Sequence, residues 1–172
     1  MACAITAGYT ISCRESVGGI DAVYIAEFGN VTPIDSSGTI TGITKATGKK
    51  FYKFEVPTKS NANAASNPVG SIENGTLFFE QSVELPINKR DATTRNIVTT
   101  LAKNKVTVVT LDKDGTYRMY GKAQGLYLAS STGQTGAAAG DANGYMLKFE
   151  GQEMEDFFVV SSAVGTALET AG

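Results

Sequence analysis

Alternation of apolar and polar side chains, interrupted by glycine, asparagine and aspartate, is the feature that most restricts the folds open to this 172-residue chain. A period of two places successive side chains on opposite faces of a strand, and the interruptions supply turns. The pattern predicts one mainly β domain of antiparallel strands over residues 1–172. The expected strands are Ile5–Cys13, Ala22–Phe28, Gly38–Ile43, Lys50–Val56, Thr76–Leu85, Val106–Leu111, Tyr117–Lys122, Leu126–Ala129, Tyr145–Glu150 and Phe157–Val160.

One hairpin has the clearest turn signal. The turn Asp112-Lys113-Asp114-Gly115 lies between two alternating runs, Val106–Leu111 and Thr116–Tyr120, and its glycine allows the positive φ that such turns need. The two aspartates could also belong to a calcium-binding loop. The remaining ligands and the distal glutamate of a calcium-binding loop are missing, which favours a plain turn.

One helix is expected beside the sheet. Asp91 is typical of a helix N-cap, and the apolar residues that follow recur at helical spacing as far as about Lys103, where Asn104 ends the run. The apolar face consists of Ile97, Val98, Leu101 and Ala102. The sequence therefore predicts one amphipathic helix packed against a sheet.

Two long segments of small and polar residues, 57–75 and 130–144, interrupt the alternation. Neither can build a core of its own, and long loops in compact domains are usually functional or flexible. We expect the loop at 57–75 to be an arm that docks on a neighbouring subunit, with a flexible surface loop as the alternative. The candidate arm residues are Asn61, Asn63, Asn67, Pro68 and Val69.

The strands that flank this arm, Lys50–Val56 and Thr76–Leu85, are expected to pair as a long hairpin. One face would be apolar and the other polar. If the edges of neighbouring subunits pair into a closed barrel, the polar face lines a channel; an ordinary solvent-facing sheet is the alternative. The candidate channel-lining residues are Lys53, Glu55, Glu80, Ser82 and Glu84.

Catalytic groups are scarce. The chain has no histidine, so the commonest general base and metal ligand is missing, and it has no Walker, dinucleotide, HExxH or CxxC motif. The acidic residues Glu150, Glu153, Glu155 and Asp156 are expected in a solvated loop, because a glycosidase would also need an aromatic-lined cleft. We expect no enzymatic activity, metal or cofactor. Tyr9, Tyr117, Tyr120 and Tyr127 leave a carbohydrate-binding β-sandwich module as an alternative.

Charge and hydropathy restrict the kinds of molecule that this chain is expected to bind. The formal charge is −2 with no basic block, which argues against a nucleic-acid groove, and no apolar run is long enough to span a bilayer. Only 19% of residues are charged, a low value for a freely soluble monomer, so a protein partner is expected. Cys3 and Cys13 are either free thiols or one bridge.

The second half of the chain resembles a known family. Its glycine and aromatic spacing, from Gly75 to Val160, is similar to that of tail tube-like structural proteins in the virions of tailed bacteriophages. The residues that carry the resemblance are Gly121-Lys122-Ala123-Gln124-Gly125-Leu126, Thr135-Gly136, Gly140-Asp141-Ala142-Asn143-Gly144-Tyr145-Met146-Leu147, Glu150-Gly151-Gln152-Glu153 and Phe158-Val159-Val160.

The resemblance implies an antiparallel β-sandwich or partial barrel with a long hairpin and one flanking α-helix. It implies a protein made in the cytoplasm of a bacterial host and incorporated into the virion tail. It implies six-membered homo-oligomeric rings that stack into a tube and conduct the genome, with sheath, terminator, baseplate or tape measure proteins as further partners. The arm would then reach an adjacent subunit or ring, and an acidic channel wall would keep DNA from adhering. A head–tail connector, a terminator ring and a capsid decoration protein remain alternatives.

Overall fold

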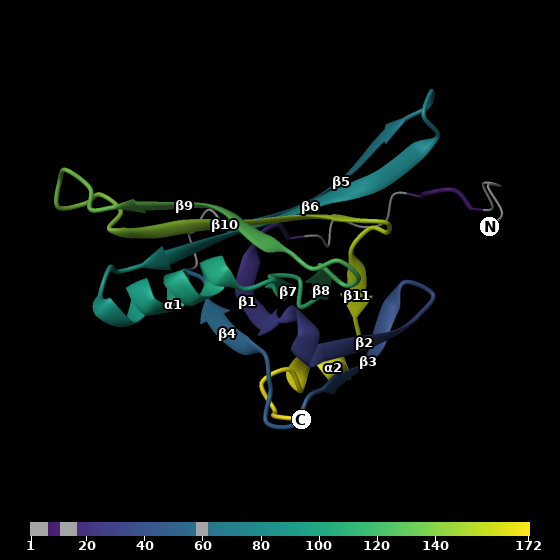
Figure 1. Cartoon of the computed structure of the whole chain (residues 1–172), viewed down its shortest axis with the longest axis horizontal. Coiled ribbons are helices and arrows are strands. Elements are labelled where there is room, and N and C mark those ends of the chain that lie inside the picture. Colours follow the sequence, from purple (N-terminus) through teal and green to yellow (C-terminus); the bar gives the residue numbers. More distant parts are fainter. Residues whose placement is uncertain (1–6, 11–16, 58–61) are drawn as a thin grey trace.

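The computed structural model describes residues 7–10, 17–57 and 62–172. Within them the chain is mainly β, with two sheets and two α-helices, and this confirms the predicted fold class (Figure 1). The helical segments are η1 (Phe28–Asn30), a short 3-10 helix, α1 (Ala92–Lys103) and α2 (Ser162–Thr166). The strands are β1 (Ile20–Glu27), β2 (Val31–Ser36), β3 (Thr39–Lys45), β4 (Tyr52–Glu55), β5 (Asn63–Ser71), β6 (Thr76–Asn88), β7 (Val106–Asp112), β8 (Tyr117–Tyr120), β9 (Tyr127–Gln134), β10 (Gly144–Glu153) and β11 (Phe158–Val160).

The larger sheet has seven strands in the order β2-β3-β11-β8-β7-β1-β4. All neighbours are antiparallel except β11 and β3. Its central strands β1 and β7 are almost continuously buried because both faces of the sheet are covered. Val23, Ile25 and Val108 belong to the core toward the smaller sheet, and Tyr24 and Val109 to a second core that also contains Leu168.

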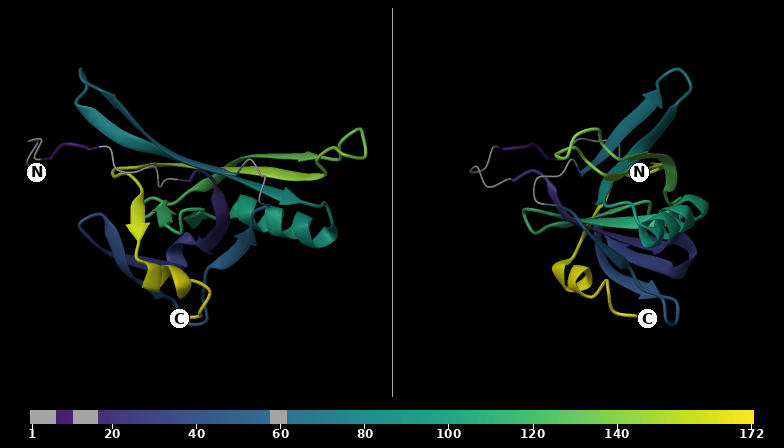
Figure 2. Two further views of the ribbon diagram at one scale, coloured as in Figure 1. Left: turned by 180° about the vertical axis from the view of Figure 1, so that it is seen from behind. Right: turned by 90° about the vertical axis from the view of Figure 1, so that its left-hand side faces the viewer.

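The smaller sheet has four antiparallel strands in the order β5-β6-β10-β9. One face packs on the larger sheet and α1 through buried Val83, Leu85, Leu147 and Phe149. Figures 1 and 2 show the β5–β6 hairpin extending past the body at one end, while the β9–β10 hairpin points toward the other. Within residues 7–10, 17–57 and 62–172, the sheet is thus covered on one face only.

Helix α1 forms where the sequence predicts it. The Asp91 side chain accepts a hydrogen bond from the Thr94 N–H at 2.7 Å, and Asn104 forms the C-cap. Val98 and Leu101 pack against the core between the sheets. Ile97 stays 39% exposed, although it belongs to the predicted apolar face, because it lies beside a groove described below.

The predicted β7–β8 hairpin is confirmed, with Val108 opposite Tyr120 and Leu111 opposite Tyr117. The predicted pairing of Lys50–Val56 with Thr76–Leu85 is wrong. β4 pairs with β1, and β6 pairs with β5 and β10. Periodicity fixes which side of a strand is apolar, but it says nothing about which strand lies next to it.

The predicted loop at 57–75 is largely a strand. β5 pairs with β6 over nine residue pairs, from Asn63–Glu84 to Ser71–Thr76, so the long hairpin consists of β5 and β6. Small residues are poor strand formers, yet pairing and the packing of Ala64 on the core override this preference. Pro68 fits here because β5 is an edge strand, where a missing N–H leaves no gap in the ladder.

The second predicted loop is also shorter than expected. β9 runs to Gln134 and pairs with β10, which leaves 135–143 as the connection. Asp141 stabilises this turn by accepting hydrogen bonds from the Ala137 and Ala138 N–H groups, both at 2.8 Å, which lower its pKa. Of the predicted Ile5–Cys13 strand, residues 7–10 have no regular structure, and the rest lies outside the described residues, as do Cys3 and Cys13.

Candidate functional site

The structure separates the predicted channel-lining residues into two groups. Lys53 and Glu55 lie on β4 in the larger sheet, where their side chains form an ion pair at 3.6 Å. Glu80, Ser82 and Glu84 lie on β6 in the smaller sheet. They do not share one face, because β4 is paired with β1 rather than with β6.

Glu80, Ser82 and Glu84 of β6 belong to a polar surface on the side of the smaller sheet that faces away from the core. Ser82 lies opposite Glu150 of β10, and Glu84 opposite Lys148. Paired residues of neighbouring strands point to the same side, so the register defines this surface directly. We call it the polar sheet face; it comprises Asn63, Asn67, Glu80, Ser82, Glu84, Lys148, Glu150 and Gln152.

The polar sheet face carries an excess of negative charge. Lys148 is its one cation, and its ammonium lies 2.7 Å from the Glu150 carboxylate. The hydrogen bond and the charge of Glu150, with a further contribution from Glu84, raise the pKa of Lys148. Glu80 is exposed and adds uncompensated negative charge. A surface of this kind gives DNA phosphates little to bind.

The predicted arm residues Asn63, Asn67, Pro68 and Val69 all lie on β5, while Asn61 lies outside the described residues. The pairing of β10 with β6 ends at Phe79, so the hairpin continues past the four-stranded sheet. We call residues 69–78 the hairpin tip. Ile72 in its turn is fully exposed, Leu77 is 65% exposed and Val69 is 36% exposed.

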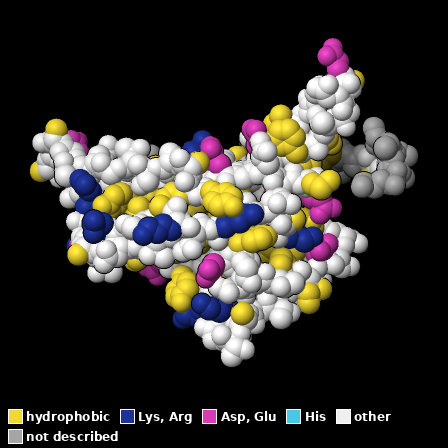
Figure 3. Space-filling model, viewed as in Figure 1, with side chains coloured by type: hydrophobic (Ala, Val, Ile, Leu, Met, Phe, Trp, Pro, Cys, Tyr) yellow, Lys and Arg dark blue, Asp and Glu magenta, His cyan; other side chains and the backbone are white. Residues whose placement is uncertain are grey.

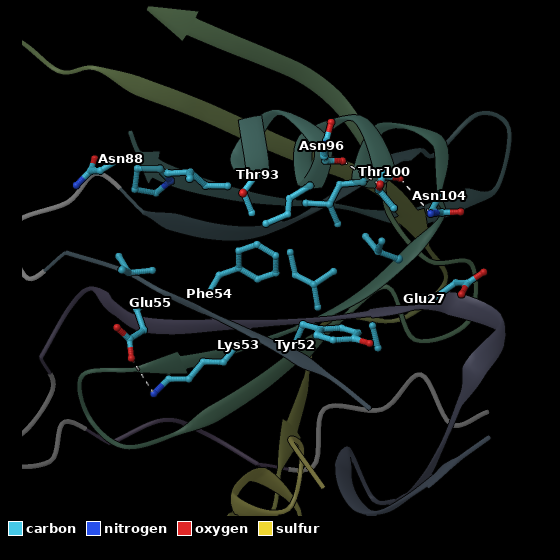
Figure 4. Close-up of a pocket in the computed structure, with 18 of the residues that line it drawn as sticks. Glu27, Tyr52, Lys53, Phe54, Glu55, Asn88, Thr93, Asn96, Thr100 and Asn104 are labelled. Carbon is cyan, nitrogen blue, oxygen red and sulfur yellow. Dashed lines mark hydrogen bonds and ion pairs between the residues drawn. The ribbon is translucent and has the colours of Figure 1, made fainter. Parts of the chain in front are cut away.

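A groove of about 1320 Å³ lies between α1 and the free edge of the larger sheet at β4 (Figure 4). We call it the α1–β4 groove. Phe54 points from β4 toward the helix, and Tyr52, from the same face of the strand, is 60% exposed. Lys53 and Glu55 pair beside it. Ile97 and Leu101 come from α1, and Pro86, Ile87 and Asn88 come from the end of β6.

A buried polar cluster connects β10 and β6 to the loop after β8. The Glu153 carboxylate, 4% exposed, accepts hydrogen bonds from the N–H groups of Ala123, Gln124 and Gly125 at 2.7–3.2 Å. Gln81, 3% exposed, accepts one from the Gly121 N–H at 2.9 Å. The prediction that Glu153 belongs to a solvated loop is wrong. Its backbone partners give no local sequence signal.

The other acidic residues of that cluster differ from Glu153. Glu150, Glu155 and Asp156 are exposed, as expected, although Glu150 lies on β10 rather than in a loop. Glu155 also lies 3.9 Å from Lys122. The four carboxylates therefore do not form one site. Glu153 supports the fold, and Glu150 belongs to the polar sheet face.

The tyrosines considered for sugar binding have different environments. Tyr120 is buried in the core and Tyr117 is half-buried, with its ring centroid 6.2 Å from that of Tyr24. Tyr9 and Tyr127 are exposed, and the Lys105 ammonium lies 5.3 Å from the Tyr127 ring. Burial of Tyr120 removes it from any exposed stacking platform.

The Asp112–Gly115 turn holds no cluster of metal ligands. Both aspartates pair with Arg118, and Asp114 also accepts a hydrogen bond from the Thr116 N–H at 2.8 Å. Across the described part of the chain, no group of three or more acidic, histidine or cysteine side chains is arranged to hold a metal ion. Among the described helices, none combines the length and apolar character needed to cross a bilayer.

Comparison of the sequence with protein-family models and with curated proteins gave no match.

Proposed function

We propose that this chain is a structural, non-enzymatic subunit of a bacteriophage tail tube, which assembles into rings that stack and conduct the genome. One observation carries the proposal: in the part of the chain that the structure describes, the four-stranded sheet has one face on the core, an uncovered polar face, and free edges at β5 and β9. Edge strands of nine and eight residues expose rows of backbone donors and acceptors, in which Pro68 of β5 is the one residue without an N–H. Pairing them with a neighbour satisfies those groups.

The strand directions allow copies of this sheet to join edge to edge around a closed ring. Because the sheet has four strands and each neighbour is antiparallel, β5 and β9 run in opposite directions. Rotation of a second copy about an axis along the strands brings its β5 beside the first copy's β9 in antiparallel orientation. Such a heterologous contact generates a ring when the rotation closes. The family resemblance implies six subunits.

The same geometry gives each face of the sheet a role. The apolar face stays on its own core, and the polar sheet face is directed either into the ring or away from it. We place it inside, where Glu80, Glu84 and Glu150 repel phosphate and let DNA slide without adhering. The proposed channel wall therefore differs from the one predicted from sequence. It keeps Glu80, Ser82 and Glu84 of β6. Residues of β10 replace the two residues of β4: Lys148, Glu150 and Gln152 take the place of Lys53 and Glu55.

Electron microscopy of negatively stained protein, with light scattering over a concentration series, tests the proposal. A tube subunit assembles by mass action without a ligand, so rings or hollow filaments of uniform diameter are expected to increase with concentration. Protein that stays monomeric at every concentration would contradict self-assembly. Single rings that never stack would favour a connector or terminator ring.

A variant separates edge pairing from other modes of association. Replacing Ser131 on β9 with proline removes an N–H from an edge strand whose other side is paired with β10. The matched control is Ser36→Pro on β2, an edge strand of the other sheet. We expect the first change to reduce ring yield at least tenfold more than the second at equal thermal stability. Equal yields would remove β9 from the interface.

A further inference from the structure

The two edge strands of the smaller sheet are offset along the strand direction. One row of paired residues crosses the whole sheet through Asn63, Glu84, Lys148 and Ser130. From this row β5 runs into the hairpin tip, whereas β9 runs the opposite way to Gln134. Figures 1 and 2 show the same offset, with the β5–β6 and β9–β10 hairpins extending toward opposite ends. Two copies placed side by side at the same height would therefore pair only the start of β5 with the start of β9.

Neither of these edge strands carries a charge. Edge strands that stay unpaired in natural proteins are commonly protected by charged residues, above all lysine. The edges of the larger sheet follow this rule, with Asp35 on β2 and with Lys53 and Glu55 on β4. β5 and β9 contain no lysine, arginine, aspartate or glutamate. In Figure 3 the surface over β9 is largely white, whereas Lys and Arg side chains lie in a row at the level of α1. The composition of both strands therefore favours pairing with a neighbour.

Side-chain direction restricts the register in which β5 and β9 can pair. Ser130 pairs with Lys148, so Ser130 and every second residue from it to Gln134 point to the side of the polar sheet face. On β5 the same is true of Asn63 and every second residue after it. A shift by one residue would place these side chains against the core side of the neighbour. Ser130 must therefore lie opposite Asn63 or a residue two, four, six or eight positions beyond it.

Pro68 selects one of these registers. Ala129 has no residue opposite it in β10, so β9 has a bulge there. With Ser130 opposite Asn67, Pro68 lies opposite this bulge, a position at which proline is tolerated. A register shifted further toward the hairpin tip would place Pro68 inside the regular run, where its missing N–H leaves out a hydrogen bond. A register shifted the other way pairs fewer residues of the two strands.

We propose that β5 of one copy pairs with β9 of the next in one staggered register, with Asn67 opposite Ser130. This inference rests on the proposed function and specifies its contact between subunits. The stagger is four residues, because Asn63 rather than Asn67 shares the row of Ser130 within one copy. The pairs of the contact are Asn63–Gln134, Ala64–Gly133, Ala65–Thr132, Ser66–Ser131 and Asn67–Ser130.

The stagger agrees with the geometry of closed barrels. Closing a sheet requires a fixed stagger, and the strands then tilt by about 35–45° from the barrel axis. Four residues over the four strands of one copy amount to one residue per strand. An eight-stranded barrel with a shear of eight has the same ratio and a tilt of about 36°. We therefore expect the strands of the smaller sheet to tilt by about 36° from the ring axis, whereas copies joined without stagger would hold them parallel to it.

Two pairs of cysteines distinguish the staggered contact from an unstaggered one. Both variants carry Cys3→Ser, Cys13→Ser and Ser130→Cys; one adds Asn67→Cys, and the matched control adds Asn63→Cys. The three positions are exposed on the same face of the sheet. Opposite residues of an antiparallel ladder have Cα atoms about 4.5–5.5 Å apart, within the range of a disulfide. Within one copy, β6 and β10 separate β5 from β9 by roughly 14 Å, so only links between copies form.

On mild oxidation of assembled protein, we expect covalent oligomers of the Asn67→Cys variant at least tenfold above those of the Asn63→Cys variant. Ala65→Cys with Thr132→Cys is a second pair of the same register and should link to a similar extent. Melting temperatures close to that of the unmodified protein show that the variants fold. Electron microscopy of the reduced samples shows that they assemble.

The outcomes separate this register from the proposed function. Rings or filaments in which the Asn63→Cys variant links as strongly as the Asn67→Cys variant overturn the stagger and leave the proposed function standing. Rings or filaments in which neither staggered pair links have the same consequence. Protein that forms no rings, filaments or links overturns both proposals.

Electron cryomicroscopy of assembled, unmodified protein gives a second measurement that needs no substitution. The expected result is a continuous sheet around the ring, with strands tilted by about 36° from the axis and Asn67 beside Ser130 of the next copy. Strands within about 10° of the axis would overturn the stagger, because the tilt of a closed barrel follows from its shear.

Discussion

At the residue scale, Glu153 is the side chain whose role differs most from its sequence context. One buried carboxylate accepts hydrogen bonds from three consecutive backbone N–H groups, Ala123 to Gly125. Buried donors left without partners are costly. The residue therefore fixes the loop after β8 onto the end of β10, next to Gln81 of β6.

Replacing Glu153 with alanine is expected to lower the free energy of unfolding by about 2–4 kcal/mol, because the buried N–H of Gly125 and the partly buried N–H groups of Ala123 and Gln124 lose their acceptor. Glu153→Gln keeps one acceptor oxygen and should lose roughly half as much. Chemical denaturation at a protein concentration below assembly measures both. Glu155→Ala, at a 70% exposed side chain, is the control and should change little. An equal loss in the control would contradict this role of Glu153.

Asp91 gives a pH-dependent test. Hydrogen bonds from Thr94, above all from its backbone N–H, lower the pKa of Asp91 below its ordinary value in the folded protein. The stabilisation by its charge is therefore complete above the unfolded pKa and is lost as pH falls through the folded pKa. Asparagine also caps helices but carries no charge.

Melting temperatures of wild type and Asp91→Asn between about pH 6 and pH 2 check this expectation. The wild type is expected to be more stable at pH 6, because a negative charge at a helix N-terminus is favourable, and the difference should shrink toward pH 2. Asp21→Asn, at an exposed position on β1, corrects for the general effect of losing a carboxylate. A difference that is constant over this range would contradict the assignment.

At the element scale, the sequence predicts those elements that are fixed by contacts between residues close together in the chain. The Asp112–Gly115 turn and the Asp91 cap gave the β7–β8 hairpin and α1 with nearly their observed bounds. The sequence does not predict β5, because this strand consists of small residues and its only strand signal is the partner that it finds on β6. The same limit explains why the predicted channel wall combines Lys53 with Glu80. Alternation shows which side of a strand is polar, but it does not show that β4 lies next to β1.

The hairpin tip can be removed without removing β5. Replacing 69–78 with Asn-Gly joins Pro68 to Phe79, two residues that face each other in the ladder. We expect the shortened chain to melt close to wild type, because the tip lies outside the four-stranded sheet, and to form rings that no longer stack. Electron microscopy checks the stacking, and stacked filaments of the shortened chain would contradict it.

The control deletion removes 62–68 instead. That segment carries most of β5, and Ala62 and Ala64 pack against the core. We therefore expect this deletion to lower the melting temperature, whereas the tip replacement does not. The comparison separates loss of stacking from loss of folding.

At the scale of the whole molecule, the two sheets have different surroundings. The seven-stranded sheet has core on both faces and holds the body together, while the four-stranded sheet keeps one face and two edges free among the described residues. Free edges on a polar sheet are an aggregation hazard unless they are paired. Within the proposed ring they become the contact between subunits, and the polar sheet face becomes the channel wall.

If that face lines the channel, adding positive charge to it should make assembled particles retain DNA. Glu80→Lys with Ser82→Lys keeps the Lys148–Glu150 pair intact and places the new lysine at position 82 opposite Glu150. The control, Asp21→Lys with Thr44→Lys, makes the same charge change at exposed positions of the other sheet. Co-sedimentation of labelled duplex DNA with the particles measures retention.

We expect the polar-face variant to bind DNA at about 50 mM salt and to release it steeply by about 200 mM, because each added phosphate contact contributes roughly −0.9 to the logarithmic salt slope. Wild type and the control variant should bind much less, since the one lysine on the polar sheet face that they share, Lys148, is paired with Glu150. Equal retention by the two variants would place both charge changes on surfaces that DNA reaches from outside. The channel wall would then lie on another face of the ring. The pairing of β5 with β9 does not depend on this result and is tested separately by the proline variant of β9.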